Sequence, residues 1–334
     1  MPLEGRRVGV IGTGASAIQL IPQVAQSAAE VTVFQRTPPW VVPKLDRPIG
    51  AAQQALYARV PLTQRAVRGV IFAITEAVGV AITRAPRLMA IGEAWSRWHM
   101  RRAIDDPALR ARLEPDYRLG CKRILVSNDF YPALARENVE LVTEGIERVT
   151  PAGVLTREYV EHELDVLVCS TGFRIEEVFA HLDIRGRDGV TLTEAWAGGI
   201  EAHRGTTVAG FPNMALLSGP NTGTGSTSQV YMIEAQIHYV SEMLRTLRES
   251  GAACVEVRLE AQATYNAWLQ RQMQRTVWLK GGCNSRYLDD HGVNRTLYPG
   301  PSSSFWRSLR RVREEEYELA PMTVPGPNRT PVAV

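Results

Sequence analysis

Apolar and polar positions along the chain follow two alternating patterns, which together predict an α/β protein. Short apolar runs typical of buried strands occupy residues 8–11, 31–34, 139–142 and 166–169. A helical pattern follows the first run from Ala15 onward. Strand and helix patterns that succeed one another in this way favour a parallel sheet covered by helices.

The first strand pattern runs into a turn with the spacing of a dinucleotide-binding site, Gly12-Thr13-Gly14, followed by Ser16 and Ala17. Gly12 permits the tight turn, Gly14 lets backbone amides approach a pyrophosphate, and Ala17 keeps the helix close to the strand. The first amides of the helix and the Ser16 hydroxyl are then expected to hold the phosphates. The alternative is an ordinary glycine-rich connection, which the strand before the turn and the helix after it disfavour.

The second strand pattern ends in Gln35-Arg36-Thr37, where NAD-binding domains usually carry an acidic residue for the ribose 2′-hydroxyl. Arg36 occurs in place of that acidic residue. Because a guanidinium suits a 2′-phosphate, the sequence favours NADP over NAD.

Length, charge and cysteine content narrow the class of protein. The 334 residues predict two domains, and a hydrophobic content of 45% suffices for a sizeable core. The net charge of +3 is too small to indicate nucleic acid or an anionic membrane as partner. Cys121, Cys169, Cys254 and Cys283 form no Cys-x-x-Cys pair, which predicts a reducing, cytoplasmic location without zinc or a redox-active disulfide. No secretory signal is recognised at the N-terminus.

Residues 49–113 are rich in Ala, Arg, Leu and Gln with helical periodicity, which predicts a helical insertion. Within it, the apolar stretch 69–83 is interrupted by Glu76 and is shorter than the roughly 20 residues that a membrane span needs. We therefore expect a buried or interfacial helix there, and no membrane span.

The second half of the chain contains a Gly/Ser/Thr/Asn-rich loop before a helix that is expected to begin near residues 226–228. Backbone amides at such a position suit an anionic or polar ligand, and a plain flexible loop is an equal alternative. Residues 305–319 predict an amphipathic helix, and the Pro-rich residues 321–334 predict a disordered tail.

Six segments in a fixed order carry a family resemblance: Gly5-Arg6-Arg7, residues 12–17, Phe34-Gln35-Arg36-Thr37, Gly120-Cys121-Lys122-Arg123, Thr171-Gly172-Phe173 and Ser218-Gly219-Pro220-Asn221. In this order they resemble the class B flavin-dependent monooxygenases, in particular Baeyer–Villiger monooxygenases of the 4-hydroxyacetophenone and cyclohexanone types. The match covers nearly all of the chain, and the combination is more specific than any one segment.

The resemblance implies a Rossmann-like α/β fold and two cofactors. Residues 1–168 would form the NADP-binding domain with its helical insertion, and residues 169–320 the C-terminal portion of an FAD-binding domain. The implied activity uses NADPH and O2 to oxygenate a small-molecule ketone or heteroatom through a C4a-peroxyflavin.

The resemblance also implies roles for individual residues. In the family, the lysine matching Lys122 meets the NADPH 2′-phosphate together with the pair matching Arg36 and Thr37. The next arginine stabilises the negatively charged peroxide, which makes Arg123 the expected catalytic residue. A further set that would contact the cofactors comprises Thr171, Gly172 and Asn221.

The family's first glycine-rich turn, which binds the ADP part of FAD, has no match in this sequence. The resemblance therefore implies a polypeptide without the enzyme's N-terminal third, and a complementary N-terminal FAD-domain polypeptide is a conceivable partner. The alternative function is a non-catalytic or partner-dependent NADP-binding half of a split or truncated monooxygenase.

Overall fold

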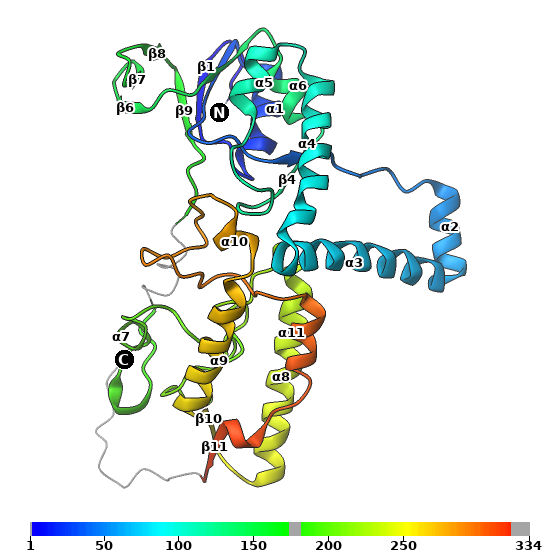
Figure 1. The fold of residues 1–334 in the computed structure, drawn as a ribbon, viewed down its shortest axis with the longest axis vertical. Coiled ribbons are helices and arrows are strands. Elements are labelled where there is room, and N and C mark those ends of the chain that lie inside the picture. The colour runs from blue at the N-terminus through cyan, green and yellow to red at the C-terminus, as the bar shows by residue number, and fades with distance from the viewer. Residues whose placement is uncertain (1, 174–181, 322–334) are drawn as a thin grey trace. The chain divides into compact units, whose positions relative to one another are not determined.

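The structure, a computed structural model, describes residues 2–173 and 182–321 (Figure 1). The chain forms two compact units, which are described in turn. The first comprises Met1–Val70, Ala85–Ile175 and Thr276–Ser285, and the second comprises Ile71–Arg84, Glu176–Arg275 and Arg286–Val334. Apart from Pro321, the tail predicted to be disordered lies outside the described residues.

A four-stranded parallel sheet forms the centre of the first unit. Its strands are β1 (Arg7–Ile11), β2 (Glu30–Phe34), β5 (Val139–Val142) and β9 (Val166–Cys169). They lie in the order β5-β2-β1-β9, so the chain winds through β2 and β5 on one side of β1 and places β9 on the other. This order confirms the predicted Rossmann-like fold class.

Helices α1 (Ala17–Ser27) and α6 (Phe130–Leu134) cover one face of this sheet. Val8, Val10 and Val33 are fully buried in the cluster that they form with these helices. The strands read as continuous apolar runs because a parallel sheet is covered on both faces.

A small antiparallel sheet packs on the same unit through a second apolar cluster. It consists of β6 (Ile146–Val149), β7 (Gly153–Thr156) and β8 (Glu161–Glu163). Phe34 and Val142 of the parallel sheet contact Val154 there.

Residues 49–113 form a succession of helices: α2 (Ala51–Arg59), α3 (Pro61–Arg84), the short 3-10 helix Pro86–Leu88, α4 (Met89–Ala103) and α5 (Pro107–Leu113). Strand β3 (Val41–Val42) before them pairs in parallel with β4 (Leu125–Val126) after them. The insertion therefore leaves the first unit and returns to it at neighbouring points.

Among the described helices, α3 alone has the length and apolar composition of a membrane-spanning helix. It is longer than the apolar stretch 69–83 that the sequence singled out, and only 22% of its most apolar window is buried. The expected buried helix is therefore wrong, and the interfacial alternative is considered below.

The second unit is mainly helical. Its elements are α7 (Leu192–Ala195), α8 (Gln229–Ser250), β10 (Cys254–Val257), α9 (Leu259–Met273), α11 (Ser302–Ser308), β11 (Tyr317–Ala320) and the short 3-10 helices Arg187–Gly189 and Glu314–Glu316; α10 (Val277–Lys280) belongs to the first unit. Helix α8 begins where predicted, with Ser228 accepting a hydrogen bond from the Val230 amide. The amphipathic helix predicted over 305–319 is wrong, because α11 ends at Ser308 and β11 pairs with β10.

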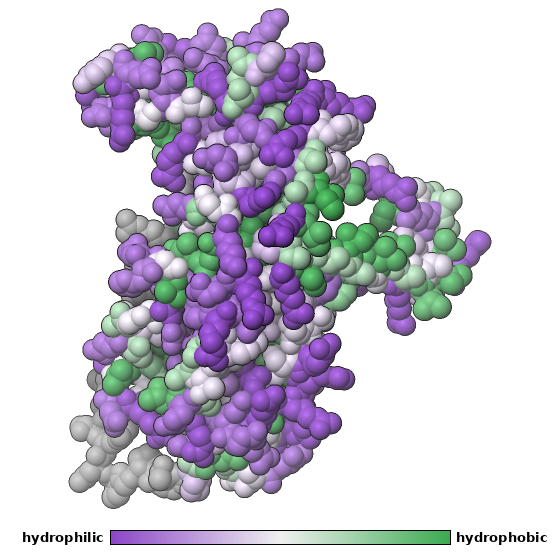
Figure 2. Space-filling model, in the orientation of Figure 1, coloured by the Kyte–Doolittle hydropathy of each residue, from purple (hydrophilic) through white to green (hydrophobic). Residues whose placement is uncertain are grey.

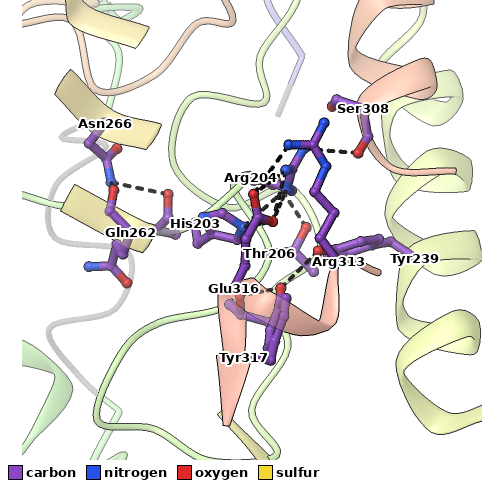
Figure 3. A network of polar contacts seen from close by, with 12 residues as sticks. His203, Arg204, Thr206, Tyr239, Gln262, Asn266, Ser308, Arg313, Glu316 and Tyr317 are labelled. Atoms are coloured by element: carbon purple, nitrogen blue, oxygen red, sulfur yellow. Dashed lines mark hydrogen bonds and ion pairs between the residues drawn. The ribbon is translucent and has the colours of Figure 1, made fainter. Parts of the chain in front are cut away.

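A buried polar network fixes the end of this second unit (Figure 3). Glu316 accepts hydrogen bonds from the Arg204 guanidinium at 2.8 Å, and its other oxygen lies 3.1 Å from Nε2 of His203. Burial alone would raise the pKa of Glu316, but the hydrogen bond to His203 and the charge of Arg204 outweigh it and lower the pKa to about 2. The Arg204 guanidinium also donates to the Ser308 carbonyl oxygen, which attaches the end of α11.

Candidate functional site

The carboxyl ends of β1, β2 and β9 meet at one edge of the parallel sheet. Ile11, the last residue of β1, is paired with Phe34 of β2 and with Cys169 of β9. Connections from neighbouring parallel strands diverge at this point, where open α/β sheets bind their ligands. The predicted residues of the first unit that follow these three strands are therefore brought to a common edge.

The conformation of the turn after β1 explains its glycines. Gly12 has φ +105°, and a Cβ there would lie 2.6 Å from the carbonyl oxygen of Ser170, so only glycine fits. A Cβ at Gly14 would meet no heavy atom of the protein within 4 Å. The space above Gly14 is therefore open to a ligand.

Helix α1 begins directly after this turn. Ala17 is fully buried in the core cluster, as expected for close packing of helix on strand. Ser16 occupies the N-cap position, but its side chain makes no capping hydrogen bond to the helix, and the first turn of the helix holds no acidic side chain. The positive end of this 11-residue helix therefore faces the turn without an internal anion.

Arg36, Thr37 and Lys122 extend the site beyond the turn. The Thr13 hydroxyl donates to the Thr37 carbonyl oxygen at 3.4 Å and so joins the first turn to the end of β2. Burial, and then the positive charge of Arg36, lower the pKa of the Lys122 ammonium. Nζ of Lys122 lies 4.9 Å from the centroid of the Tyr117 ring, whose hydroxyl donates to the Pro38 carbonyl oxygen shortly after β2.

The loop that carries Lys122 and Arg123 is anchored by a buried carboxylate. Glu93 of α4 is 5% exposed and accepts hydrogen bonds from the Arg118 guanidinium at 3.1 Å and from the Leu119 amide at 3.2 Å. A backbone amide and a guanidinium held by one carboxylate leave this end of the loop little freedom.

A disulfide holds the same loop from a second side. Cys121 and Cys283 are bonded, and Arg118 donates its amide to the Gly281 carbonyl oxygen at 2.9 Å. Disulfides are rare in the reducing location that the sequence predicts, so this bond counts against that prediction, while Cys169 and Cys254 are free. The fold brings together two residues separated by 162 positions, which spacing alone does not reveal.

A cavity of about 750 Å³ opens beside the first turns of α1. Arg123 lines it together with Ala15 of the turn, Gln19 of α1, and Lys44 and Arg47 of the connection before α2. The predicted catalytic arginine therefore lies at the same hollow as the start of the phosphate-binding helix.

Two of the remaining predicted residues lie at the edge, and one does not. Thr171 and Gly172 follow β9 after Ser170, and both are exposed. Gly172 has a left-handed conformation with φ +93°. Asn221 belongs to the second unit, where it is 2% exposed and donates its amide group to the carbonyl oxygens of Asn294 and Leu297. Its side chain therefore shapes the loop of the second unit.

Residues that sequence reasoning missed were Glu93, Lys44, Arg47 and Gln19. For Glu93 a signal existed, because it is the only acidic residue between positions 77 and 104, a stretch with five arginines. A lone carboxylate among cations is a natural partner for one of them. Lys44, Arg47 and Gln19 have no such signal, since their common cavity arises only from the folded chain.

A parallel sheet, a glycine turn at its switch point and cations at the end of the second strand define a dinucleotide-binding α/β protein. No family model matches the chain. A Baeyer–Villiger monooxygenase of Streptomyces coelicolor is 44% identical over 95% of this chain and 61% of its own length. One of Pseudomonas aeruginosa is 42% identical over 95% of this chain and 60% of its own length.

Solved structures agree with these relatives. A crystal structure of OTEMO complexed with FAD and NADP matches with a TM-score of 0.81 and 26% identity, over 96% of this chain and 67% of that chain. The chain is therefore similar to Baeyer–Villiger monooxygenases over nearly its whole length. It spans about 60% of the length of the curated relatives. Each relative contains the matched region and the remainder of its length in a single chain. A separate complementary polypeptide is therefore not supported.

Proposed function

We propose that the first unit binds NADP(H) and that the chain serves a flavin-dependent monooxygenase, which uses NADPH, FAD and O2 to oxygenate a ketone or a heteroatom. The observation that carries the proposal is the pair Arg36 and Lys122 beside the Gly12 turn. The charge of Arg36 lowers the pKa of Lys122, and a 2′-phosphate bound between the two cations relieves this repulsion.

The residues at the sheet edge fit NADP in both charge and shape. The amides from Gly12 to Ser16 would hold the pyrophosphate, because the turn is open at Gly14 and α1 directs its positive end there. Arg36, Thr37 and Lys122 would hold the 2′-phosphate. NAD lacks this phosphate, so these residues would select NADP.

Arg123 would supply a permanent positive charge where the cavity begins. A guanidinium presents donors in a fixed fork that suits negatively charged oxygen. When bound, NADPH supplies a hydride and FAD supplies the centre that reacts with O2. The role proposed for Arg123 is to stabilise negative charge on oxygen near this centre, and its position at the cavity leaves the guanidinium accessible.

The proposed cofactor contacts of Thr171 and Gly172 rest on their position at the switch point next to Gly12. The side-chain amide of Asn221 already donates hydrogen bonds within the second unit. We therefore propose that the loop around Asn221, and not its side chain, contacts the cofactor. The proposal also includes a cytoplasmic location, which fractionation of expressing cells would test.

Calorimetry of the full chain with NADP and with NAD tests the binding part of the proposal. We expect NADP to bind at least tenfold more tightly, and equal millimolar affinities for both would contradict it. Oxygen consumption with added FAD, NADPH and a ketone then tests catalysis, with Arg123→Ala as the variant expected to lose oxygenation. NADP binding without oxygen consumption would favour the alternative, a non-catalytic NADP-binding chain.

A further inference from the structure

Within the described residues, the first half of α3 is not covered by other parts of the chain. Every residue from 64 to 71 is exposed. Five large apolar side chains of α3 are 43–70% exposed, and Figure 2 shows hydrophobic residues gathered along this helix. These are Leu62, Val67, Val70, Ile71 and Ile74. Single exposed apolar residues are common, but a contiguous group of this kind marks an interaction surface.

The five side chains lie on one side of the helix. At 3.6 residues per turn, positions 62, 67, 70, 71 and 74 fall within one half of the helix circumference, and Arg65 and Arg68 fall on the other half. The first half of α3 is therefore amphipathic, with an apolar side and a polar side whose charges are positive.

The charge of α2 and the first half of α3, between Asp46 and Glu76, is of one sign. Residues 47–75 contain Arg47, Arg59, Arg65 and Arg68 and no acidic residue or lysine. The segment thus carries +4, and the remaining residues carry +3 minus +4, or −1. The small net charge of the whole chain, which argued against an anionic membrane, conceals this local concentration.

The preceding helix is also exposed. No residue of α2 is buried, and Leu56 and Val60 are both more than 40% exposed. Isolated helices of this length are only marginally stable in water and gain stability from a surface that covers their apolar side.

We propose that α2 and the first half of α3 bind the surface of an anionic lipid bilayer, with α3 lying in the interfacial plane. Apolar side chains would enter the boundary of the acyl chains, and the arginines would meet the phosphate and carboxylate groups of the lipids. The helix does not cross the bilayer, because Gly79, Ala81 and Ile82 at its other end are buried in protein.

Flotation of the full chain with lipid vesicles tests the proposal. Vesicles of phosphatidylcholine with one third phosphatidylserine should retain the protein, vesicles of phosphatidylcholine alone should retain much less, and high salt should release it. Arg65→Gln and Arg68→Gln should each weaken binding to the anionic vesicles about 5-fold. Val67→Ser combined with Ile71→Ser should weaken it about 10-fold or more.

Matched controls come from α8, which also exposes apolar and basic residues. Leu244→Ser and Arg248→Gln remove an exposed leucine and an exposed arginine outside the proposed surface, so they should leave vesicle binding unchanged. Circular dichroism should show that every variant keeps the helical content of the parent chain, since all the substituted side chains are exposed.

Three outcomes would overturn the proposal. The first is the absence of binding to anionic vesicles, and the second is binding that does not respond to Arg65→Gln and Arg68→Gln. The third is a dimer in solution that Val67→Ser and Ile71→Ser dissociate, because a second copy of the chain would then cover the face.

Discussion

Replacing Arg36 by alanine should reduce the preference for NADP without weakening NAD binding. A hydrogen bond to a charged group contributes about 1.5–3 kcal/mol, which corresponds to a factor of about 10–150 in affinity. Arg36 is exposed, and its loss also removes the repulsion that lowers the pKa of Lys122. Because Lys122 then holds its proton more firmly, we expect the lower end of this range, about tenfold, for Arg36→Ala.

The double variant Arg36→Ala with Lys122→Met should lose much more NADP affinity than Arg36→Ala alone, because neither cation is then present to bind the 2′-phosphate. Its expected loss is about 100-fold or more for NADP, with NAD affinity changed little. Arg6→Ala is the control, since Arg6 precedes β1 at the opposite edge of the sheet and is equally exposed. Isothermal titration calorimetry of the parent chain and these three variants with both coenzymes measures the affinities.

Proton uptake provides an independent check of the same reasoning. A bound phosphate raises the pKa of Lys122 above its lowered value in the free protein, so binding takes up protons. NADP affinity should therefore fall as the pH rises through the pKa of Lys122 in the free protein, and Lys122→Met should abolish this dependence. Equal losses for NAD and NADP in the variants would refute the assignment of these residues to the 2′-phosphate.

Three further predictions concern the supports of the site and the second unit. Glu93→Ala should lower the free energy of unfolding by about 1–2 kcal/mol in denaturant titrations and weaken NADP binding, with Glu93→Gln less affected because it can still accept from the loop amide. Thiol titration of the unfolded, unreduced chain should find two reactive cysteines of four, and Cys283→Ser should destabilise the protein by up to about 5 kcal/mol on chain-entropy grounds. The lowered pKa of Glu316 contributes stability that is present above about pH 4.5 and lost as the pH falls towards about 2, so an acid titration of Glu316→Gln should lack this loss.

The sequence predicts those parts of the site whose residues lie close together in the chain, because their relative positions then follow from local backbone structure. The Gly12 turn and the end of β2 could be recognised because each function lies within a few residues of a strand end. The common edge of β1, β2 and β9 follows from the parallel topology, so Arg36 and Thr171 could be placed there without coordinates.

Long-range pairs could not be predicted in this way. The bond between Cys121 and Cys283 and the contacts of Glu93 with the Arg118 loop depend on how helices pack, which no local pattern records. The strand Tyr317–Ala320 was mistaken for helix because its periodicity is weak and its partner β10 lies more than 50 residues earlier. Tertiary pairing overrides local propensity in such cases.

The segment Thr276–Ser285 belongs to the first unit but follows most of the second unit in the sequence. This order affects when the first unit can fold during synthesis. Translation proceeds from the N-terminus, so the ribosome makes about a hundred residues of the second unit before this segment emerges. Until then the loop at Cys121 lacks its covalent tether, and the nascent nucleotide-binding unit remains unfinished. Completion of the first unit therefore waits until residues 176–275 of the second unit have been synthesised.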